Sequence, residues 1–431
     1  MSRRVVVTGV GWITPLGHDV ETVWRRLLAG ESGIAQTTIF DGSTFPSTFS
    51  AEVRDFDLAR FLGPDTAEHA DASRNASFAL AASRIAWDDS GLSLDNGLDR
   101  TRVGVYLGGG EGPMDFENFC AAAVKGMQAG EGRDLNAVRW AEVAYERLSS
   151  VRELEQDPNM AAAHIARLFQ VEGPNFNTLT ACAASTQAIG EATGIIRRGD
   201  ADAMISGGTH SMIHPFGVTG FNRLTALSTR NDSPESSSRP FDRTRDGFVL
   251  GEGAAMVILE ERDRARARGA KIYGEIAGFG STADAFRITD IHEDGRGGIA
   301  AMQMALDNAG VSADDVNYIS AHGTGTQEND KIETLAIRTL FGELAYKIPI
   351  SSIKSMMGHL IAAAGAVELI ACLLAIRDDK IPPTTNYSTP DPNCDLDYVA
   401  NEARDLPVNI CLSNSFGFGG QNDTLIIKKD A

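Results

Sequence analysis

The sequence predicts an α/β fold that is divided between two lobes. Short apolar runs rich in β-forming residues alternate along the chain with alanine-rich stretches of helical character. The chain has 431 residues, which is more than one hydrophobic core normally organises. Residues 262–268 are rich in arginine and alanine and are predicted to form an outer helix between the lobes. We therefore expect an N-terminal lobe over residues 1–261 and a C-terminal lobe over residues 262–431.

Eight apolar runs have the length and composition of strands. They occupy residues 4–8, 102–107, 203–207, 254–260, 271–280, 316–321, 348–352 and 424–428. Residues 114–157 differ from the rest, because they are polar, favour helix and contain Gly126, Gly130 and Gly132 as expected breaks. We interpret this segment as an excursion from the core in the form of a helical cap.

Composition and charge exclude several classes of function. Hydrophobic residues make up 43% of the chain and charged residues 23%, as in ordinary globular proteins. The longest apolar stretches fall far short of the roughly 20 residues that a membrane-spanning helix needs, so no membrane association is expected. A formal net charge of −19 argues against nucleic acid as a partner. Five cysteines without paired or metal-type spacing indicate reduced thiols and a cytoplasmic protein.

Cys182 lies where a predicted strand meets a predicted helix. Residues 175–182 run as a strand into a cluster of small residues, and residues 183–198 have helical character with Gly199 as a stop. At a helix N-terminus the unpaired amides and the helix dipole favour a thiolate, which is the form that attacks an acyl carbonyl or thioester. From its position alone, Cys182 could equally be a reactive cysteine or a small buried residue of the core. The other four cysteines lack this setting and are expected in the core.

Two histidines follow predicted strands in matching strand–loop–helix contexts. His322 begins a glycine- and threonine-rich loop that contains Thr324 and Thr326, and His359 precedes an alanine-rich helix. A lone histidine is more often a structural group. Two in such contexts favour a pair of hydrogen-bond donors at a developing enolate oxygen.

Three charged residues near these histidines are predicted to support them. Lys354 precedes His359 by five residues and is expected to orient or tune it, with a solvated surface lysine as the alternative. Glu333 and Asp330 are expected to support the His322 loop. Their alternative role is that of ordinary acids in the first turn of a helix.

Residues 411–422 form a predicted loop rich in glycine and phenylalanine between a short strand and the final strand. Its composition frees backbone amides to face a ligand, and one of them is expected to join the amide of Cys182 in an oxyanion hole. Phe418 is a candidate gate, with a hydrophobic plug as the alternative. Phe416 and Gly419 are the other predicted substrate-binding residues of this loop.

Two further patterns are assigned no site. His210 and His214 have i, i+4 spacing, but Pro215 ends any helix there and no carboxylate completes a metal set. The Gly9-Val-Gly11 stretch lacks the third glycine of a dinucleotide-binding fingerprint and is interpreted as a tight turn.

Seven motifs spread over almost the whole chain resemble those of the β-ketoacyl-acyl-carrier-protein synthase family, and most nearly its type II elongating condensing enzymes. They are VVVTGVGWITPLG at 5–17, TACAAS at 180–185, ALSTRND at 226–232, SRPFDRTRDGFVLGEGA at 238–254, AHGTGT at 321–326, IKSMMGHLIAAAGAVE at 353–368 and NSFGFGGQN at 414–422. The resemblance implies a thiolase-like fold of five α-β-α-β-α layers, with two similar lobes of mixed sheets in a homodimer.

The resemblance also implies roles for single residues. Cys182 matches the family nucleophile, while His322 and His359 match the pair that assists malonyl decarboxylation and stabilises the enolate. Lys354 matches the lysine beside the second histidine. Glu333 matches the acid downstream of the first, and Phe418 matches the gate.

The implied reaction is ping-pong elongation of a fatty acid or related lipid. Cys182 accepts an acyl chain from acyl carrier protein, malonyl carrier protein then loses carbon dioxide, and the resulting carbanion attacks the acyl thioester. No metal or organic cofactor is implied beyond the phosphopantetheine arm of the carrier.

Three stretches depart from the family pattern. Residues 114–157 are longer than usual, which leaves the acyl preference open. Residues 66–74 read TAEHADASR, where carrier-binding members tend to carry lysines and arginines that face an acidic carrier, so docking is expected to shift towards Arg223 or the pair Arg197 and Arg198. Residues 327–330 read Gln-Glu-Asn-Asp where a Pro and a Gly are more common, which predicts a different local loop geometry.

Other functions would require different residues at these positions. A degradative thiolase would need a second cysteine in the C-terminal glycine loop, and a Cys-His-Asn condensing enzyme would have asparagine at His359. A non-catalytic chain-length partner would lack Cys182. A Cys-His hydrolase, a non-enzymatic scaffold and a ketosynthase of a polyketide or unusual-lipid pathway remain open.

Overall fold

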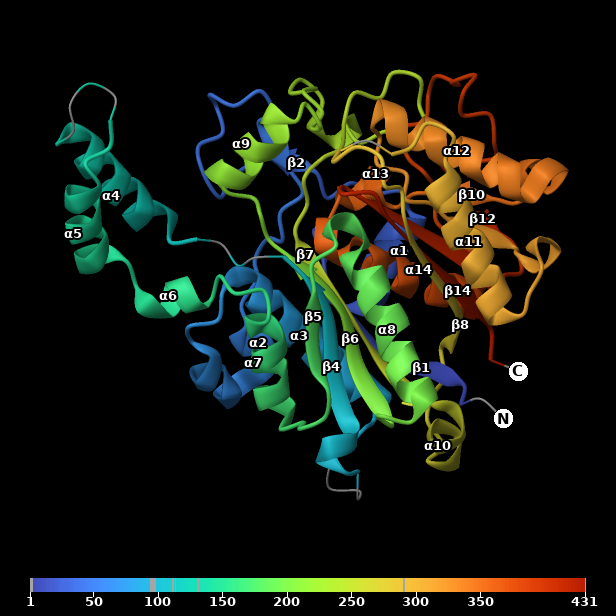
Figure 1. Cartoon of the computed structure of the whole chain (residues 1–431). Helices are drawn as coiled ribbons and strands as arrows, with labels where there is room; N and C mark the ends of the chain where they lie inside the picture. The colour runs from blue at the N-terminus through green and yellow to red at the C-terminus, as the bar shows by residue number, and fades with distance from the viewer. Residues whose placement is uncertain are drawn as a thin grey trace.

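The computed structural model describes residues 3–93, 98–110, 112, 114–129, 132, 134–289 and 291–430, and its main sheet has ten strands (Figure 1). The strand order is β10-β9-β13-β14-β8-β1-β7-β6-β4-β5. The strands are β1 (Val5–Ile13), β4 (Val103–Gly109), β5 (Asn175–Thr178), β6 (Ala203–His210), β7 (Gly253–Glu261), β8 (Gly274–Ala283), β9 (Tyr318–Ser320), β10 (Ile350–Ser351), β13 (Ile410–Gly417) and β14 (Gln421–Lys428). All eight predicted strands are therefore present, although those at 316–321 and 348–352 are shorter than expected.

The sheet consists of two halves with one topology. The order β1-β7-β6-β4-β5 in the first half has the same sequence of antiparallel and parallel pairings as β8-β14-β13-β9-β10 in the second. The halves join where β1 pairs with β8 over a short stretch, Val6 with Glu275 and Val7 with Gly274. The predicted α/β fold with two similar halves of mixed sheet is confirmed.

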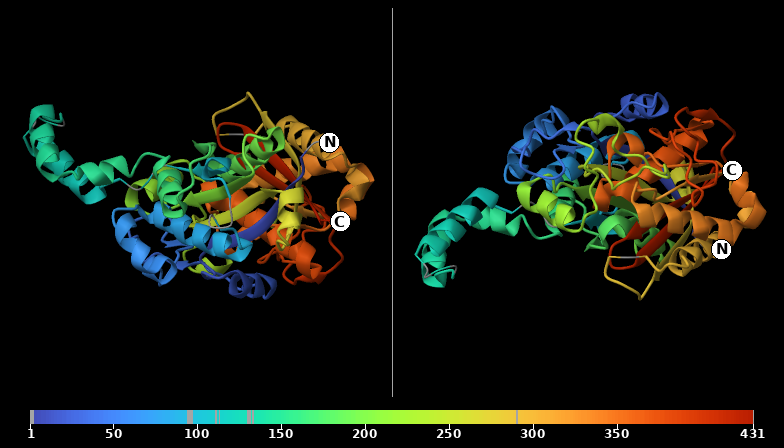
Figure 2. Two further views of the ribbon diagram at one scale, coloured as in Figure 1. Left: turned by 90° about the horizontal axis from the view of Figure 1, so that it is seen from below. Right: turned by 90° about the horizontal axis from the view of Figure 1, so that it is seen from above.

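Helices cover both faces of the sheets and also separate the two halves (Figure 2). Helices α8 (Ala184–Arg198) and α14 (Ala364–Asp378) pack against each other in the middle, α3 (Arg74–Ser90) and α7 (Met160–Phe169) cover the first half, and α11 (Arg296–Ala309) and α12 (Gln327–Phe341) cover the second. Residues 364–376 of α14 are all buried, which explains why all of them except Glu368 are apolar or small. The five predicted layers are confirmed.

The remaining elements are short and lie around this framework. They are α1 (Val20–Leu28), β2 (Ala35–Gln36), β3 (Phe49–Ser50), α2 (Ala59–Leu62), α9 (Pro215–Arg223), α10 (Arg262–Ala267), α13 (Lys354–Met357), β11 (Lys380–Ile381) and β12 (Arg404–Asp405). The chain passes from β7 to β8 through α10, at the place where the outer helix is predicted. In the part of the chain that the structure describes, no helix is both long and apolar enough to cross a membrane.

Gly9 and Gly11 do not form a turn, so that prediction is wrong. Both lie inside β1, which continues to Ile13. A Cβ atom on Gly9 would lie 2.0 Å from the carbonyl oxygen of Ala86, and one on Gly11 would lie 2.3 Å from that of Ala82. The two glycines therefore let α3 approach the strand at backbone distance.

The excursion at 114–157 is helical, as predicted, but it does not cap the body. Helices α4 (Phe116–Gln128) and α5 (Ala137–Arg147) form a hairpin that projects away from the sheets, with α6 (Ser150–Leu154) at its base (Figures 1 and 2). Gly126 is not a break: it lies within α4 and packs against Trp140 and Leu135 of the other limb. Gly132 lies in the connecting turn, and Gly130 lies outside the described residues.

The C-terminal loop is shorter than predicted. Strand β13 runs from Ile410 to Gly417 and includes Phe416, so only residues 418–420 form the turn to β14. Paired strands hold Phe416 more firmly than a loop would, because its backbone belongs to the hydrogen-bonded ladder opposite Asn422.

Candidate active site

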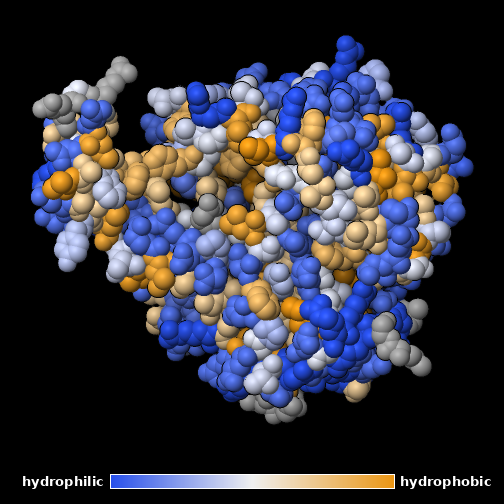
Figure 3. Space-filling view, viewed as in Figure 1, coloured by the Kyte–Doolittle hydropathy of each residue, from blue (hydrophilic) through white to orange (hydrophobic). Residues whose placement is uncertain are grey.

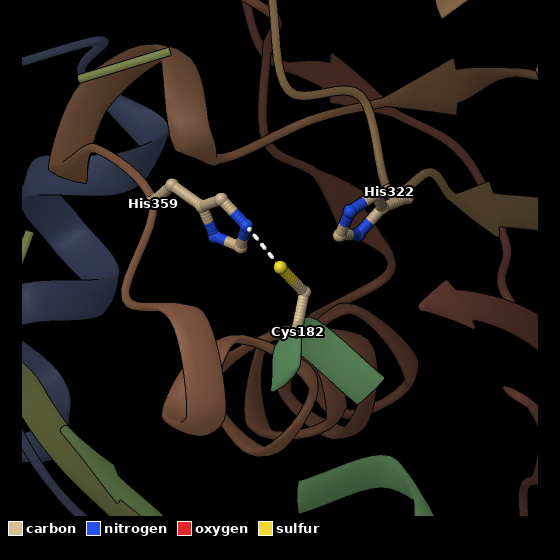
Figure 4. Close-up of side chains that lie close together, drawn as sticks. All are labelled: Cys182, His322 and His359. Carbon is tan, nitrogen blue, oxygen red and sulfur yellow. Dashed lines mark hydrogen bonds between the residues drawn. The ribbon is translucent and has the colours of Figure 1, made fainter. Parts of the chain in front are cut away.

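Three side chains from distant parts of the chain meet between the two halves (Figure 4). The sulfur of Cys182 lies 3.0 Å from Nε2 of His359. One ring nitrogen of His322 completes a set of three atoms that all lie within 4.8 Å of one another. The ring centroids of His322 and His359 are 5.4 Å apart. The structure thus brings together all three residues that the sequence predicts as the catalytic set.

Local structure presents Cys182 at the start of α8. A single 3-10 turn, η4 (Ala181–Ala183), follows β5 and leads directly into that helix, which ends at Gly199 as predicted. Ala181 has a φ of 49°, a left-handed conformation that L-residues rarely adopt. This strained residue directs the following cysteine towards the histidines.

The resting charge of Cys182 differs from the prediction. Burial raises the pKa of its thiol to about 11, because the interior disfavours a charged sulfur. The positive charge of Lys354 and the backbone amides of Phe418 and Cys182 act in the opposite direction, lowering the pKa of the thiol. The expectation of a resting thiolate is therefore wrong: the buried sulfur rests as a thiol.

The backbone fixes the tautomer of His359. The amide of Ile361 donates to Nδ1 of His359 at 3.2 Å, so Nδ1 acts as an acceptor. Burial lowers the pKa of this histidine well below its usual value, and the charge of Lys354 adds to the effect. The neutral ring therefore carries its proton on Nε2, which faces the sulfur of Cys182.

Lys354 fixes His322 in the same way. Its Nζ donates to the carbonyl oxygen of His322 at 2.6 Å and lies 3.5 Å from Nδ1 of that ring. Burial lowers the pKa of His322 well below its usual value, with the charge of Lys354 as the second cause. Both rings are consequently neutral, and both have a proton on Nε2 available for donation. Lys354 was expected to orient or tune His359: its charge lowers the pKa of that ring, but its direct contacts are with His322.

Glu368 is a functional residue that the sequence interpretation missed. It lies in α14, is buried, and forms a very short ion pair with Lys354. Burial raises the pKa of Glu368 to about 7, while Lys354 lowers it. The available signal was a single acid among the apolar residues 364–376, because buried charges are normally paired.

Two acids hold the loop that carries His322, as predicted. The carboxylate of Glu333 accepts from the amides of His322 and Gly323, each at 2.8 Å. Oδ1 of Asp330 accepts from the amides of Thr324 and Gly325 at 3.0 and 3.2 Å. Burial raises the pKa of Glu333 to about 7, although its amide bonds lower it.

The glycines of this loop have backbone conformations that favour their residue type. Gly323 and Gly325 have φ values of 36° and 83°, where a side chain would introduce strain. Helix α12 begins at Gln327, earlier than the predicted start near Asp330. The residues 327–330 that depart from the family pattern thus belong to its first turn.

The two amides predicted for an oxyanion hole, those of a residue in the turn after β13 and of Cys182, lie near the sulfur. The backbone amides of Phe418 and Cys182 both lower the pKa of the Cys182 thiol. Phe416 is buried, and its ring lies 5.9 Å from that of His322. Gly419 is exposed and its amide donates to the carbonyl of Ile288 at 2.7 Å, so it joins two loops and is not a lining residue.

Two cavities meet at this site. The first, of about 300 Å³, is lined by Cys182, both histidines, Thr324, Thr326, Phe416 and Phe418. The second, of about 340 Å³, is lined by mostly apolar or small residues and a few polar ones, among them Ala181 and Ala184 on either side of Cys182 in the chain. Phe418 lines both cavities, which is the position expected of a gate.

The other two histidines of interest lie apart from this set. Nδ1 of His214 accepts from the amide of Gly217 at 3.4 Å and caps α9. His210 is buried at the end of β6 and lines the second cavity. Within the described residues, the only group with metal-ligand spacing is Cys182, His322 and His359. Protons on both Nε2 atoms suit hydrogen-bond donation to a substrate oxygen.

A duplicated α/β fold with a buried cysteine and two neutral histidines between its halves defines a thiolase-like condensing enzyme. The chain belongs to the β-ketoacyl synthase family: the N-terminal domain of that family matches residues 2–265 and the C-terminal domain matches residues 273–388.

Relatives and solved structures resemble the chain over its full length. It is 43% identical to 3-oxoacyl-[acyl-carrier-protein] synthase 2 of Coxiella burnetii, with 99% of each chain covered. It is 44% identical to the enzyme of the same name from Synechocystis, covering 99% of this chain and 98% of the relative. Among solved structures, a type II PKS ketosynthase in complex with its acyl-carrier protein covers 100% of both chains at 34% identity with a TM-score of 0.88.

Proposed function

We propose that this chain is a 3-oxoacyl-[acyl-carrier-protein] synthase, which condenses an acyl group on Cys182 with malonyl carrier protein in fatty acid or related lipid elongation. Curated relatives of that name cover the whole chain at 43% and 44% identity. The observation that carries the proposal is the 3.0 Å contact between the sulfur of Cys182 and Nε2 of His359. His322 lies beside this pair and, like His359, carries its proton on Nε2.

In the first step the sulfur of Cys182 attacks the thioester carbonyl of the acyl carrier. The amides of Cys182 and Phe418 stabilise the oxyanion, and the positive end of α8 favours the negative charge that develops. The proton of the Cys182 thiol leaves with the thiol of the carrier arm. The products are an acyl thioester on Cys182 and a free carrier thiol.

In the second step the malonyl thioester occupies the first cavity. The Nε2 protons of His322 and His359 both donate to its thioester oxygen, which becomes the enolate oxygen when carbon dioxide leaves. The carbanion then attacks the acyl carbonyl, the C–S bond to Cys182 breaks, and the sulfur takes up a proton. The product is a 3-oxoacyl chain, longer by two carbons, on the carrier.

Mass spectrometry of the intact protein after incubation with acyl carrier protein tests the proposal. The wild type should gain one acyl group, and Cys182→Ala should gain none. Malonyl carrier protein added afterwards should remove the adduct with release of carbon dioxide. An adduct on Cys182→Ala equal to that on the wild type would refute the mechanism.

We also propose that the reaction uses no metal or organic cofactor beyond the phosphopantetheine arm of the carrier. All its charges are accounted for by protein groups: the amides at the sulfur, two neutral imidazoles, and Lys354 behind one of them. Thr324 and Thr326 line the route to Cys182, where their hydroxyls suit the amides of such an arm. Full activity after exhaustive chelation is the expected result.

The carrier is proposed to dock beside Arg223. This residue is exposed at the end of α9, and the residues that follow it, Leu224 and Thr225, line the first cavity. The alternative pair is occupied: Arg197 donates to the carbonyls of Ile276 and Ala277, and Arg198 pairs with Asp200.

Replacement of Arg223 tests this docking surface. Arg223→Ala should raise KM for malonyl carrier protein by about threefold to tenfold, because a single exposed ion pair contributes on the order of 1 kcal/mol. The rate with a small malonyl thioester that lacks the carrier should not change. Arg198→Ala is the matched control, and an equal rise of KM in that variant would refute the assignment.

A homodimer is proposed from the edge of the sheet. Strand β5 ends the strand order; Phe176 within it is 50% exposed and Leu179 just after it is 52% exposed. The projecting hairpin exposes further large apolar side chains (Figure 3), among them Val124, Met127, Leu135, Val138, Val151 and Leu154. A second copy that pairs with β5 would cover the edge and these side chains.

Light scattering coupled to gel filtration tests the dimer. The wild type should have twice the mass of the chain, and a Phe176→Asp, Leu179→Asp double variant should have the mass of one chain. A wild type with the mass of one chain at micromolar concentration would refute the dimer.

The cytoplasm is the proposed compartment, which the five free cysteines of the chain support.

A ketosynthase of a polyketide or unusual-lipid pathway is the second candidate function, favoured by the similarity to the type II PKS ketosynthase. It would share the cysteine and the two histidines and would differ in the acyl chain that it accepts.

A further inference from the structure

A buried arginine lies within the motif SRPFDRTRDGFVLGEGA at residues 238–254. The side chain of Arg245 is only 1% exposed. The next three residues, Asp246, Gly247 and Phe248, line the first cavity, but Arg245 itself does not. A buried guanidinium needs partners for its five N–H groups, because an unpaired buried charge is costly. The partners of Arg245 therefore show what it holds in place.

The guanidinium of Arg245 holds the backbone of the loop that follows His322. Its Nε donates to the carbonyl oxygen of Thr326 at 3.0 Å, and its Nη2 donates to that of Gln327 at 2.9 Å. Its Nη1 donates to the carboxylate of Asp391 at 2.6 Å, which anchors the guanidinium. Thr326 and Gln327 both line the first cavity. Arg245 thus fixes a cavity wall that it does not itself form.

Asp330 fixes the same loop through its amide groups. Its carboxylate lies 3.6 Å from Nε of Arg245 and accepts from the amides of Thr324 and Gly325. The amide of Gly247 also donates to the carbonyl oxygen of Gly325, at 3.0 Å. The ion pair of Arg245 and Asp330 therefore holds both the carbonyl and the amide groups of this loop.

The loop carries the hydroxyls of Thr324 and Thr326 along the route to Cys182. The two Oγ1 atoms lie 2.9 Å apart, and both residues line the first cavity. A hydrogen bond to a substrate weakens steeply when its distance or angle departs from the optimum. A loop held by charge-assisted hydrogen bonds keeps both hydroxyls in place, although the guanidinium that holds it does not touch the substrate.

We propose that Arg245 is a positioning residue for the carrier arm. It holds residues 324–327 so that the hydroxyls of Thr324 and Thr326 meet the amides of the phosphopantetheine arm. The inference rests on the proposed function, because that function supplies the arm. Arg245→Lys is the informative substitution: it keeps the positive charge but replaces the planar fork by a single ammonium group, which cannot reproduce the bonds to both carbonyls.

Acylation of Cys182 by two octanoyl thioesters tests this role, with intact-mass analysis as the measurement. Octanoyl pantetheine has the amides of the arm, and S-ethyl octanethioate has none. The wild type should have the lower KM for octanoyl pantetheine. In Arg245→Lys this KM should rise about tenfold, because two hydrogen bonds to the arm are weakened together. The rate with S-ethyl octanethioate should stay that of the wild type.

Removal of the two hydroxyls separates positioning from a general structural role. In a Thr324→Val, Thr326→Val background, adding Arg245→Lys should change KM for octanoyl pantetheine by less than about twofold, because the groups through which Arg245 acts are gone. A merely structural role would show its full effect in that background as well.

Arg239→Lys is the matched control. This arginine belongs to the same motif and donates to the carbonyl oxygen of Ser236 and to Oγ1 of Thr244, not to the loop that follows His322. Both thioesters should therefore react with this variant as with the wild type.

Asp391→Asn is a milder variant that keeps the buried guanidinium. It weakens the anchor of Arg245 and should raise KM for octanoyl pantetheine by about threefold, as expected for one weakened bond. The melting temperature should stay within a few degrees of that of the wild type. If Arg245→Lys does not fold, Asp391→Asn decides by the same criterion.

The failures of the two proposals are distinguishable. If no thioester acylates Cys182, the proposed function is wrong. If the wild type does not favour octanoyl pantetheine, or if the variants of Arg245 and Asp391 leave its KM unchanged or affect both thioesters equally, this inference is overturned.

Discussion

The two halves of the molecule share a topology but supply different chemistry at equivalent positions. In the first half the turn η4 leads into the 15-residue helix α8, and in the second half η8 (Ile361–Ala363) leads into the 15-residue helix α14. Each turn opens with a residue of positive φ, 49° at Ala181 and 43° at Ile361. The next residue is Cys182 in one half and Ala362 in the other.

The loops that precede these helices also differ between the halves, because only those of the second half carry histidines of the site. Strand β4 ends at Gly109 and is followed by Gly110, whereas β9 is followed closely by His322. Likewise His359 lies two residues before Ile361, at the position that Leu179 holds before Ala181. One half therefore provides the nucleophile and the other half provides both imidazoles. The comparison shows that the start of a helix does not by itself make a catalytic cysteine.

Moving the cysteine between the halves should have the largest effect. Cys182→Ala should lower condensation by at least about 10⁴-fold, as expected when a covalent nucleophile is removed. Adding Ala362→Cys to that variant places a thiol in the equivalent turn, but without histidines from the opposite half. It should not restore the acyl adduct, and intact-mass analysis will detect one if it forms.

An acyl adduct on the double variant, at the thiol introduced by Ala362→Cys, would contradict this view, because the turn and the helix alone would then suffice. Circular dichroism and the melting temperature provide the control for folding. Both variants should retain the wild-type values within a few degrees.

Removing either histidine should have an intermediate effect. His322→Ala and His359→Ala should still be acylated, because the oxyanion hole and Cys182 are intact. Release of carbon dioxide from malonyl carrier protein should fall by about 10²-fold to 10³-fold, the usual cost of one donor at an oxyanion. The measurement is release of labelled carbon dioxide. His359→Gln, which keeps an N–H donor, should retain more activity than His359→Ala.

Loss of acylation in one histidine variant would assign that ring to the cysteine step. For His359 this outcome would mean that Nε2 accepts the thiol proton, contrary to the tautomer that Ile361 imposes. For His322 it would mean that Lys354 acts on the sulfur through that ring.

A change of pH should affect the cysteine of the first half and leave the histidines of the second half unaffected. The rate of alkylation of Cys182 should change by about tenfold per pH unit, whereas the rate of decarboxylation should not. The raised pKa of Cys182 predicts that alkylation of the free enzyme by iodoacetamide becomes faster up to about pH 11, because each unit below the pKa lowers the thiolate fraction tenfold. The lowered pKa values of His322 and His359 keep both rings neutral as the pH falls through 6.5. Decarboxylation by the acylated enzyme should therefore show no inflection near pH 6.5.

An alkylation profile that levels off below about pH 8 would show that the dipole of α8 outweighs burial at the sulfur. An inflection of decarboxylation near pH 6.5 would show that one ring titrates like an exposed histidine. The first outcome would correct the charge state assigned to Cys182, and the second would correct that assigned to one histidine. Neither would affect the assignment in the other half.

Much of the fold and of the candidate site could be predicted, because those features are local. Strand-like runs, the stop at Gly199 and the acids that follow His322 depend on neighbours in the sequence, and the structure confirms them. The prediction for Gly9 and Gly11 failed because the reason for these glycines is contact with α3, far along the chain. Nothing in residues 114–157 alone indicates that their helices project away from the body.

The sequence by itself determined which residues carry the chemistry and on which kind of junction each one lies. Only the tertiary structure decided the protonation state of Cys182, the tautomers of both histidines and the pairing of Lys354 with Glu368. The physical reason is separation along the chain: 177 residues separate Cys182 from His359, and 32 separate Lys354 from His322. Burial and contacts over such distances set the charge of each group, and they exist only once the two halves have packed together.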